Sequence, residues 1–242
     1  MRVKEFSNVP TPSDSPRPGD SATPTDSAQP SSARPTVEVS VRQTGDLSKR
    51  AKGHPEEQVA KYVERAFERL GVPYRVTWDL PPVQDIAPSR PDRENKRRQL
   101  DQWSERLADE RTPHVRKDSN LLLTDRAGGG ISKLGKRAAV APAGTLTEDA
   151  DMAEWVAPDD PRHCVYGTLH ELGHNLHAGG HERSWGRTWV DEGTKSWNRT
   201  PMGHGGGGVN LCGERNDPRP ERYPKRDHLY FADCAREHIQ IR

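Results

Sequence analysis

The residues of this chain that could do chemistry gather in the segment 170–181, which reads HELGHNLHAGGH. The segment begins with HExxH, the pattern in which a helix presents two zinc-binding imidazoles one turn apart, with a carboxylate beside the first. Residues four positions apart lie on one helix face, so His170 and His174 can bind the same ion. Glu171 lies about 100° around the helix from His170, where it can take a proton from water without binding the metal. The segment therefore predicts a hydrolytic zinc site.

The residues around the motif predict the helix that it requires. Asp160 is placed to cap that helix and Pro161 to be its first residue. A surface face rich in histidine is the alternative interpretation, but such a face has no reason to carry this order of residues. An apolar stripe at helical spacing runs along the side opposite the histidines and fits a protein core. The stripe consists of Val165, Leu169, Leu172 and Leu176.

A catalytic zinc ion takes three protein ligands and keeps one position for water, so a third ligand must follow the pair. His177 is on the correct helix face, but it lies about 10 Å along the axis from the first histidine, which fits one ion poorly. His181 follows the Gly-Gly pair at 179–180, which can take the positive φ angles of a sharp reversal. A distant carboxylate, Asp191 or Glu192, is the remaining alternative. We favour His181 as the third ligand.

Composition divides the chain into a tail and one folded domain. Residues 1–53 begin with a segment rich in Pro, Ser and Thr that cannot bury enough apolar surface to fold, and we expect a disordered tail there. Within the tail, the alternation of valines over 37–41 indicates an edge strand or merely extended chain.

The domain occupies 54–242. Its predicted elements are a helix from 54 to Leu70, a strand over 74–80, a helix around 98–107, a central strand over 120–125, a strand over 138–142 that is a candidate sheet edge at Val140, and a closing helix over 229–239.

Charge and hydropathy narrow the function classes. The formal net charge of the 242 residues is +1, which gives no global field that favours nucleic acid. No apolar run approaches the ~20 residues that span a bilayer. No apolar signal segment is visible at the N-terminus, so these features do not assign the protein to a compartment. The three cysteines, Cys164, Cys212 and Cys234, are too few for a disulfide framework and lack the spacing of a zinc site, although Cys212 and Cys234 are candidates for one pair.

The segment 170–181 resembles the extended zinc motif HExxHxxGxxH of the metzincin metallopeptidases. The family has Gly at the place of His177 and its third His at the place of Gly180, so the match requires one extra residue before His181. Metzincins also have a tight turn with a Met beneath the zinc. Residues 200–203, which read TPMG, are turn-like, suitably downstream, and contain Met202.

The resemblance implies an α+β, zincin-like fold. It has a twisted sheet with backing helices above the active-site helix (54–178) and a small irregular lower subdomain that ends in a helix (179–242). It implies Zn²⁺ on His170, His174 and His181, with Glu171 as general base. Some members have a Tyr two residues beyond the Met; this chain has His204 there, which could stabilise the intermediate or approach the metal.

The predicted activity is hydrolysis of peptide bonds by a zinc-dependent metalloendopeptidase. We expect a protein or peptide substrate, no nucleic-acid partner, no membrane span and a monomer, and the resemblance favours a secreted protein. Two other functions share the same residues. One is a zinc-dependent amide hydrolase that acts on a non-protein substrate. The other is a non-catalytic domain with a structural zinc, which would need a closed site of four protein ligands.

Overall fold

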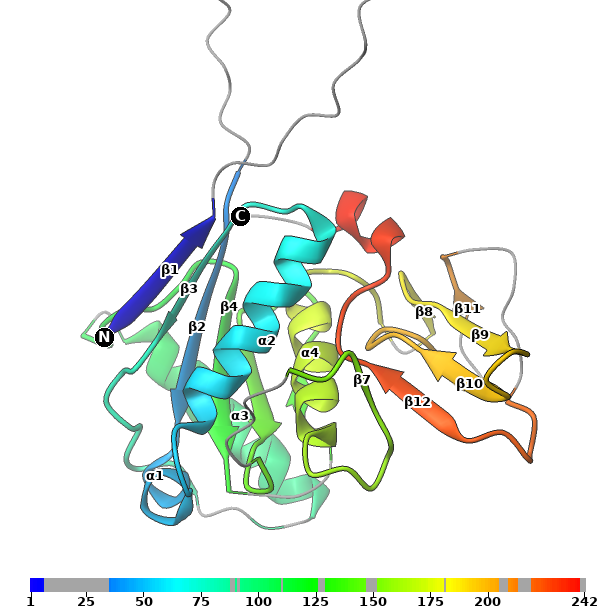
Figure 1. The fold of residues 1–242 in the computed structure, drawn as a ribbon. Coiled ribbons are helices and arrows are strands. Elements are labelled where there is room, and N and C mark those ends of the chain that lie inside the picture. The colour runs from blue at the N-terminus through cyan, green and yellow to red at the C-terminus, as the bar shows by residue number, and fades with distance from the viewer. Residues whose placement is uncertain are drawn as a thin grey trace, which may run out of the picture.

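A six-stranded sheet forms the larger part of the protein in its computed structural model (Figure 1). The strand order is β1-β3-β2-β4-β6-β5, in which β3, β2, β4 and β6 are parallel and both edge strands are antiparallel to their neighbours. The strands are β1 (Arg2–Phe6), β2 (Val37–Gln43), β3 (Tyr74–Trp78), β4 (Ser119–Thr124), β5 (Ile131–Ser132) and β6 (Ala138–Pro142). The structure describes residues 1–6, 35–87, 90, 92–109, 111–125, 129–146, 152–180, 182–204, 209–212 and 219–239.

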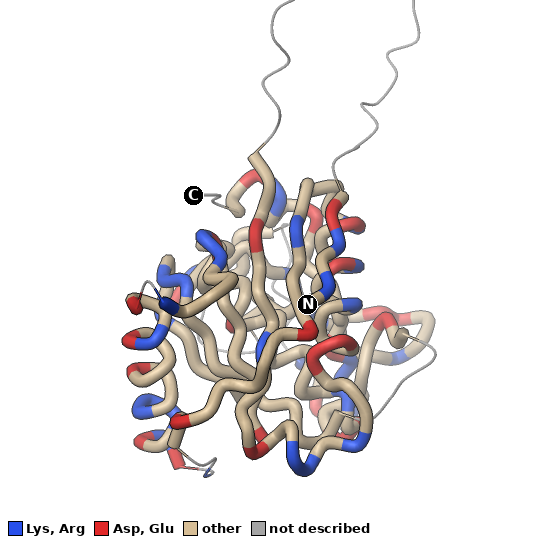
Figure 2. Tube along the Cα trace, turned by 90° about the vertical axis from the view of Figure 1, so that its left-hand side faces the viewer, with Lys and Arg blue, Asp and Glu red and all other residues tan. Residues whose placement is uncertain are grey.

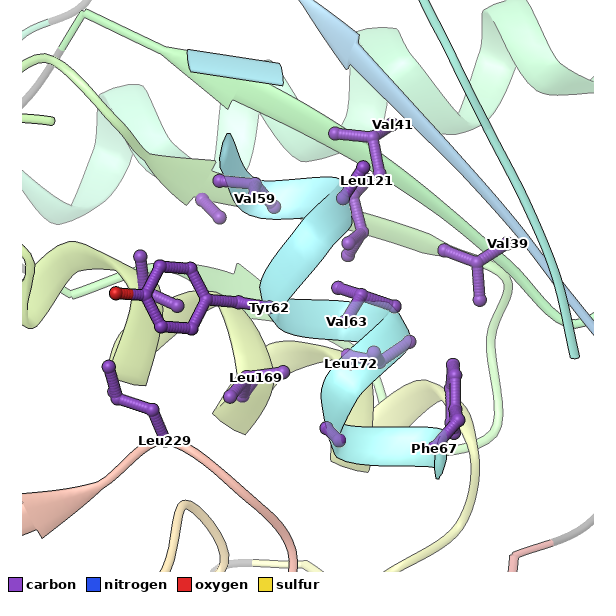
Figure 3. Packing of buried hydrophobic residues seen from close by; sticks show 14 of the residues in the cluster. Val39, Val41, Val59, Tyr62, Val63, Phe67, Leu121, Leu169, Leu172 and Leu229 are labelled. Carbon is purple, nitrogen blue, oxygen red and sulfur yellow. The ribbon is translucent and has the colours of Figure 1, made fainter. Parts of the chain in front are cut away.

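Helices cover both faces of this sheet, because the central strands bury apolar side chains on both sides. On β4, Leu121 and Leu123 face α2 and α4, whereas Leu122 faces α3. Figure 3 shows Leu169 and Leu172 of α4 packed with α2 and with Leu121 in the larger of the two cores. The helices are α1 (Gly45–Arg50), α2 (Pro55–Leu70), α3 (Arg93–Ala108) and α4 (His163–Asn175).

Local sequence signals set the ends of the two long helices. Pro55 occupies the first turn of α2, and Gly71 ends the helix in the left-handed conformation with φ 61°. The Asp92 carboxylate accepts the Asn95 N–H at 2.6 Å and caps α3. The predicted helix before Gly71, the strand that follows it, the α3 helix and the central strand β4 are all confirmed.

A second, smaller sheet lies beside α4, on the side away from β1 (Figure 1). It has the order β7-β12-β10-β9, and a two-stranded pair β11-β8 accompanies it. A disulfide between Cys212 and Cys234, whose Cα atoms are 5.8 Å apart, joins the segment after β11 to the short 3₁₀ helix η1. The remaining elements are β7 (Trp155–Val156), β8 (Arg183–Ser184), β9 (Thr188–Asp191), β10 (Ser196–Arg199), β11 (Val209–Asn210), β12 (Lys225–His228) and η1 (Asp233–Glu237).

The expected tail over 1–53 is wrong for β1, β2 and α1, which belong to the fold, while residues 7–34 lie outside the described residues. The strand β2 is also not an edge, because it lies between β3 and β4. The polar residues between its valines are buried as well. Ser40 Oγ donates to Asn120 Oδ1 at 2.8 Å, and the Arg42 guanidinium donates to the Pro113 carbonyl. The alternation of valines therefore does not mark an edge strand here, because hydrogen bonds to other segments allow the intervening polar residues to be buried.

Three further expectations need correction. The strand β6 is not the sheet edge, since β5 pairs with its outer side through Val140 and Ala139. The predicted lower subdomain contains a small sheet rather than irregular chain. This sheet includes β7, which precedes α4 in the sequence, so the predicted boundary between residues 178 and 179 does not separate the two parts. The closing helix shrinks to the five residues of η1. Short strands with charged residues, such as β12, carry no apolar alternation from which to predict them.

No helix in the described ranges has the length and apolar character that crossing a membrane requires. Lys and Arg residues are interspersed with Asp and Glu in the view of Figure 2, and neither sign of charge collects in one place there.

Leu169→Ala tests the packing of α4, because Leu169 is fully buried between that helix and the sheet. We expect the free energy of unfolding to fall by about 2–5 kcal/mol, from lost burial and the cavity left behind. Leu134→Ala removes the same atoms from a side chain that is 54% exposed, and we expect a loss below about 1 kcal/mol. Denaturant unfolding followed by circular dichroism measures both. Equal losses in the two variants would contradict the packing described.

Candidate metal centre

The helix α4 carries the HExxH residues and is fixed from both ends. It begins at His163, later than expected, because Asp160 does not cap it directly. The Asp160 carboxylate instead accepts the Arg162 N–H at 2.8 Å and the guanidinium at 2.9 and 2.7 Å, which holds these residues in a turn before the helix. At the other end, the Asn175 amide and the Ser119 hydroxyl of β4 hydrogen-bond at 2.9 Å. The predicted apolar stripe is confirmed, since Val165, Leu169, Leu172 and Leu176 are all fully buried.

The two histidines of the motif face each other. His170 Nδ1 lies 2.6 Å from the Pro201 carbonyl oxygen, and His174 Nδ1 lies 2.7 Å from that of Gly179. A carbonyl only accepts hydrogen bonds, so each Nδ1 carries a proton and Nε2 is the ring nitrogen that can bind a metal. The two Nε2 atoms are 3.1 Å apart. A cation or a shared proton between them would stabilise this close approach.

This arrangement fits the donor set of a zinc site. Histidine ligands of metals commonly donate their second ring N–H to a backbone carbonyl or a carboxylate, which fixes the tautomer and the ring orientation. Nitrogens bound to one tetrahedral zinc ion at about 2.0–2.1 Å lie roughly 3.3 Å from each other. His174 is buried, and a backbone carbonyl holds each ring. The pair thus has the geometry that two of the three protein ligands of a catalytic zinc require.

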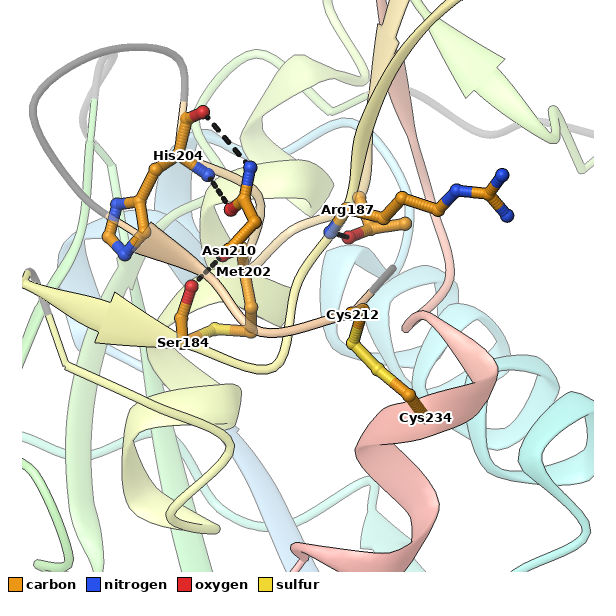
Figure 4. The surroundings of a disulfide bond; sticks show 8 residues. Ser184, Arg187, Met202, His204, Asn210, Cys212 and Cys234 are labelled. Atoms are coloured by element: carbon orange, nitrogen blue, oxygen red, sulfur yellow. Dashed lines mark hydrogen bonds between the residues drawn. A yellow bond between two sulfur atoms is a disulfide. The ribbon is translucent and has the colours of Figure 1, made fainter. Parts of the chain in front are cut away.

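The turn that contains Met202 lies directly against α4. The Gly203 N–H donates to the Thr200 carbonyl at 2.8 Å, which closes the turn, and this turn supplies the Pro201 carbonyl that holds His170. The Met202 side chain is buried so close to Gly173 that a Cβ on this glycine would overlap its sulfur. The Ser184 hydroxyl donates to the Met202 carbonyl (Figure 4). The sequence thus located the turn, and the structure adds its hydrogen bond to the first histidine.

Glu171 is buried beside the pair and is held by a residue that the sequence reasoning missed. The Ser132 hydroxyl, on the edge strand β5, donates to Glu171 Oε2 at 2.6 Å. Gly130 provides the room for this side chain, because a Cβ there would collide with Glu171 Cγ and the Val140 carbonyl. Nothing in the sequence marks Ser132, since β5 has only two residues and its contact with α4 depends on the sheet order.

A cavity of about 320 Å³ opens beside the motif. His170 and Glu171 lie on its wall, together with His204, whose N–H donates to Asn210 Oδ1 at 2.6 Å (Figure 4). The structure thus brings His204 to the same cavity as the motif, as the sequence suggested. Three further residues on the wall come from α4 and β10, and the sequence reasoning did not single them out. These are His163, Tyr166 and Arg199.

A buried ion-pair cluster centred on Asp227 supports this wall. Asp227 is fully buried in β12; its carboxylate lies 2.7 Å from His163 Nε2 and accepts from Arg199 Nε at 2.5 Å, with Lys225 Nζ at 3.0 Å. Burial alone would raise the pKa of Asp227, but hydrogen bonds from His163 and Arg199 outweigh it and hold the pKa at about 2. The sequence could not locate this cluster, because its residues come from three elements that only the fold joins.

The alternatives for the third ligand are not brought to the pair. His177 follows the helix with φ 61°, and its ring lies against Gly135 of the turn between β5 and β6. Asp191 and Glu192 lie at the exposed tip of the β9–β10 hairpin, where they bond Thr194 and Lys195 (Figure 1). His181 lies outside the described residues. Within the ranges that the structure describes, which exclude 181, no group of three or more His, Cys, Asp or Glu residues could hold a metal ion.

The comparisons with known proteins add no relative. No protein-family model matches the chain, and a search of curated proteins finds no match.

Acid unfolding tests the Asp227 cluster. A carboxyl whose folded pKa is about 2, against an ordinary 3.8, stabilises the fold above pH 3.8, and this stabilisation is lost as the pH falls towards 2. We expect the wild type to lose about 2 kcal/mol from this group over that range, and Asp227→Asn to lose correspondingly less. The matched control is Asp101→Asn, whose carboxylate is 60% exposed. Denaturant unfolding at pH 2 to 5 measures how steeply the free energy of unfolding of each variant changes with pH. If Asp227→Asn shows the same pH dependence as the wild type, the cluster does not stabilise the fold as described.

Proposed function

We propose that the protein is a zinc-dependent hydrolase that cleaves peptide bonds as a metalloendopeptidase. One observation carries the proposal: backbone carbonyls hold His170 and His174 with their Nε2 atoms facing each other, and Glu171 lies on the wall of the same cavity as His170. A structural zinc would need a closed set of four protein ligands. The two histidines line neighbouring surface cavities, and a carboxylate shares the wall of the first, which favours a catalytic site instead.

Zinc at the histidine pair would supply Lewis acidity, which polarises the scissile carbonyl and makes water acidic enough to lose a proton near neutral pH. Glu171 takes that proton and passes it to the leaving amine. The hydrogen bond from Ser132 to Oε2 orients the Glu171 carboxylate beside the pair. His204 lies on the same wall and is positioned to donate a hydrogen bond to the negative charge that develops on the substrate oxygen.

His181 is the proposed third ligand, and its neighbours support it. Gly179 has φ 134°, a conformation that a side chain would strain, and its carbonyl holds His174. The chain then reverses, since the Gly180 N–H donates to the Arg183 carbonyl at 2.8 Å. Gly180 and Glu182, on either side of residue 181, line one cavity together with His174.

The metzincin resemblance remains part of this proposal. The α+β fold, the turn at Met202 beneath the helix and the order of elements around α4 support it. The Cys212–Cys234 disulfide favours an oxidising compartment, which agrees with the secreted proteins of that family. An amide hydrolase that acts on a non-protein substrate would share every metal residue, and a substrate screen that sets peptides against small amides separates the two.

Glu171→Gln tests the general base. We expect the variant to bind zinc as the wild type does and to lose kcat by roughly 10²–10⁴-fold, because the amide cannot take a proton. Glu105→Gln, an exposed residue on α3 across the sheet, is the matched control with unchanged kcat. Peptide hydrolysis with and without a chelator, together with zinc content by atomic emission, gives the readout. Wild-type kcat in Glu171→Gln would refute the mechanism.

A second pair of variants tests the third ligand. We expect His181→Ala to lose the zinc at a chelator concentration that the wild type withstands, because two imidazoles remain to hold the ion. His177→Ala should retain it, since that ring lies against Gly135. Competition with a zinc-binding dye measures both affinities. Zinc loss in His177→Ala with retention in His181→Ala would reverse the assignment.

A further inference from the structure

Arg199 is the cation on the cavity wall, and its position is coupled to the metal ligands. It is the last residue of β10, directly before the Thr200–Gly203 turn whose Pro201 carbonyl holds His170. The Arg199 side chain is 20% exposed and lines the same cavity as His170 and Glu171. The guanidinium therefore lies at a fixed place beside the site of the proposed reaction.

The guanidinium is oriented by Asp227 and by an aromatic ring. Nε and Nη2 donate to the two oxygens of Asp227 at 2.5 and 3.4 Å, and the guanidinium carbon lies 4.6 Å from the centre of the Tyr166 ring. Tyr166 is itself fixed, because its hydroxyl donates to the Thr200 carbonyl at 3.1 Å. Within the described part of the chain, Nη1 has no hydrogen-bond partner. An arginine held on one edge and stacked on its face keeps its other edge to bind an anion.

The charges of the cluster favour an anionic ligand. Asp227 carries one negative charge, whereas Arg199 and Lys225 next to it carry two positive charges, so the cluster has a net charge of +1 without His163. Among the described residues that line the cavity, the one carboxylate is that of Glu171, which accepts a hydrogen bond from Ser132. A positive wall of low exposure attracts a negative group strongly, since few waters compete for it.

We propose that Arg199 binds a free carboxylate of the substrate next to the scissile bond, so that the substrates are peptides with a negative charge at that place. A planar carboxylate is the anion that a guanidinium edge matches with two parallel hydrogen bonds. The carboxylate could be the C-terminus of the substrate or an acidic side chain that flanks the cleaved bond. This inference rests on the proposed function, because the scissile bond is defined by the zinc pair and Glu171.

Matched substrates test the inference. One pair of fluorogenic peptides differs in a C-terminal acid or amide, and a second pair has Asp or Asn beside the cleaved bond. In one of these pairs, we expect the wild type to cleave the peptide with the carboxylate with a kcat/KM roughly 10- to 100-fold higher, the range of a charge-assisted hydrogen bond. The pair that shows this preference identifies whether the carboxylate is the C-terminus or an acidic side chain. Arg199→Gln should bring that preference close to one, and Arg199→Lys should leave an intermediate value.

Arg226→Gln is the matched control, because Arg226 is adjacent to Asp227 in β12 but packs over the Trp155 ring and does not line the cavity. It should keep the wild-type preference. Peptide hydrolysis without preference for the carboxylate in either pair would overturn the inference and leave the proposed function intact. A preference that survives in Arg199→Gln would overturn it as well.

A binding measurement separates failure of the inference from failure of the proposed function. Calorimetry with zinc-loaded Glu171→Gln uses two uncleaved probe pairs: N-acetyl-glycyl-alanine as acid and amide, and N-acetyl-glycyl-aspartate amide against its asparagine counterpart. We expect tighter binding of the carboxylate probe of one pair, which Arg199→Gln in the same background abolishes. If this holds while the wild type cleaves no peptide, the carboxylate site stands and the peptidase proposal fails. Equal binding of the probes with and without Arg199 would overturn the inference.

Discussion

The hydrogen bonds from the two histidine Nδ1 atoms to backbone carbonyls are the constraint on which the account depends. They fix both tautomers, and they set the two Nε2 atoms 3.1 Å apart. The carbonyls belong to the Met202 turn and to the Gly179 reversal, so segments far apart in the chain must both be in place. The cores around α4 and the buried Met202 hold these segments. The geometry of the pair is thus a product of the whole fold.

The smaller sheet supplies the other wall of the cavity. Its strands β10 and β12 are parallel neighbours, and their pairing places Arg199 opposite Asp227. The fully buried carboxylate then contacts three side chains, those of His163, Arg199 and Lys225. Arg199 leads directly into the turn that holds His170, so the cationic wall and the histidine pair are joined through one short segment of chain. In the same part of the protein, the Cys212–Cys234 disulfide joins the segment after β11 to η1.

The sequence predicted the elements whose residues carry local signals. Gly71 and Asp92 mark helix ends, the leucines of β4 mark a central strand, and HExxH with its apolar stripe marks α4. It failed where partners come from elsewhere in the fold. The valines over 37–41 indicated an edge strand or extended chain, because the partners that bury Ser40 and Arg42 between them are over 70 positions away. Ser132, Arg199 and Asp227 are ordinary polar residues in short strands, and only the topology brings them to the motif.

X-ray absorption at the zinc edge of the purified, zinc-loaded protein tests whether the histidine pair binds zinc. We expect one zinc ion per chain, with a first shell of nitrogen and oxygen at about 2.0–2.1 Å that includes imidazole and contains no sulfur. Substitution of both His170 and His174 by alanine should remove this signal. A protein that binds no zinc, or one whose zinc has sulfur ligands at about 2.3 Å, would refute a zinc site at this pair.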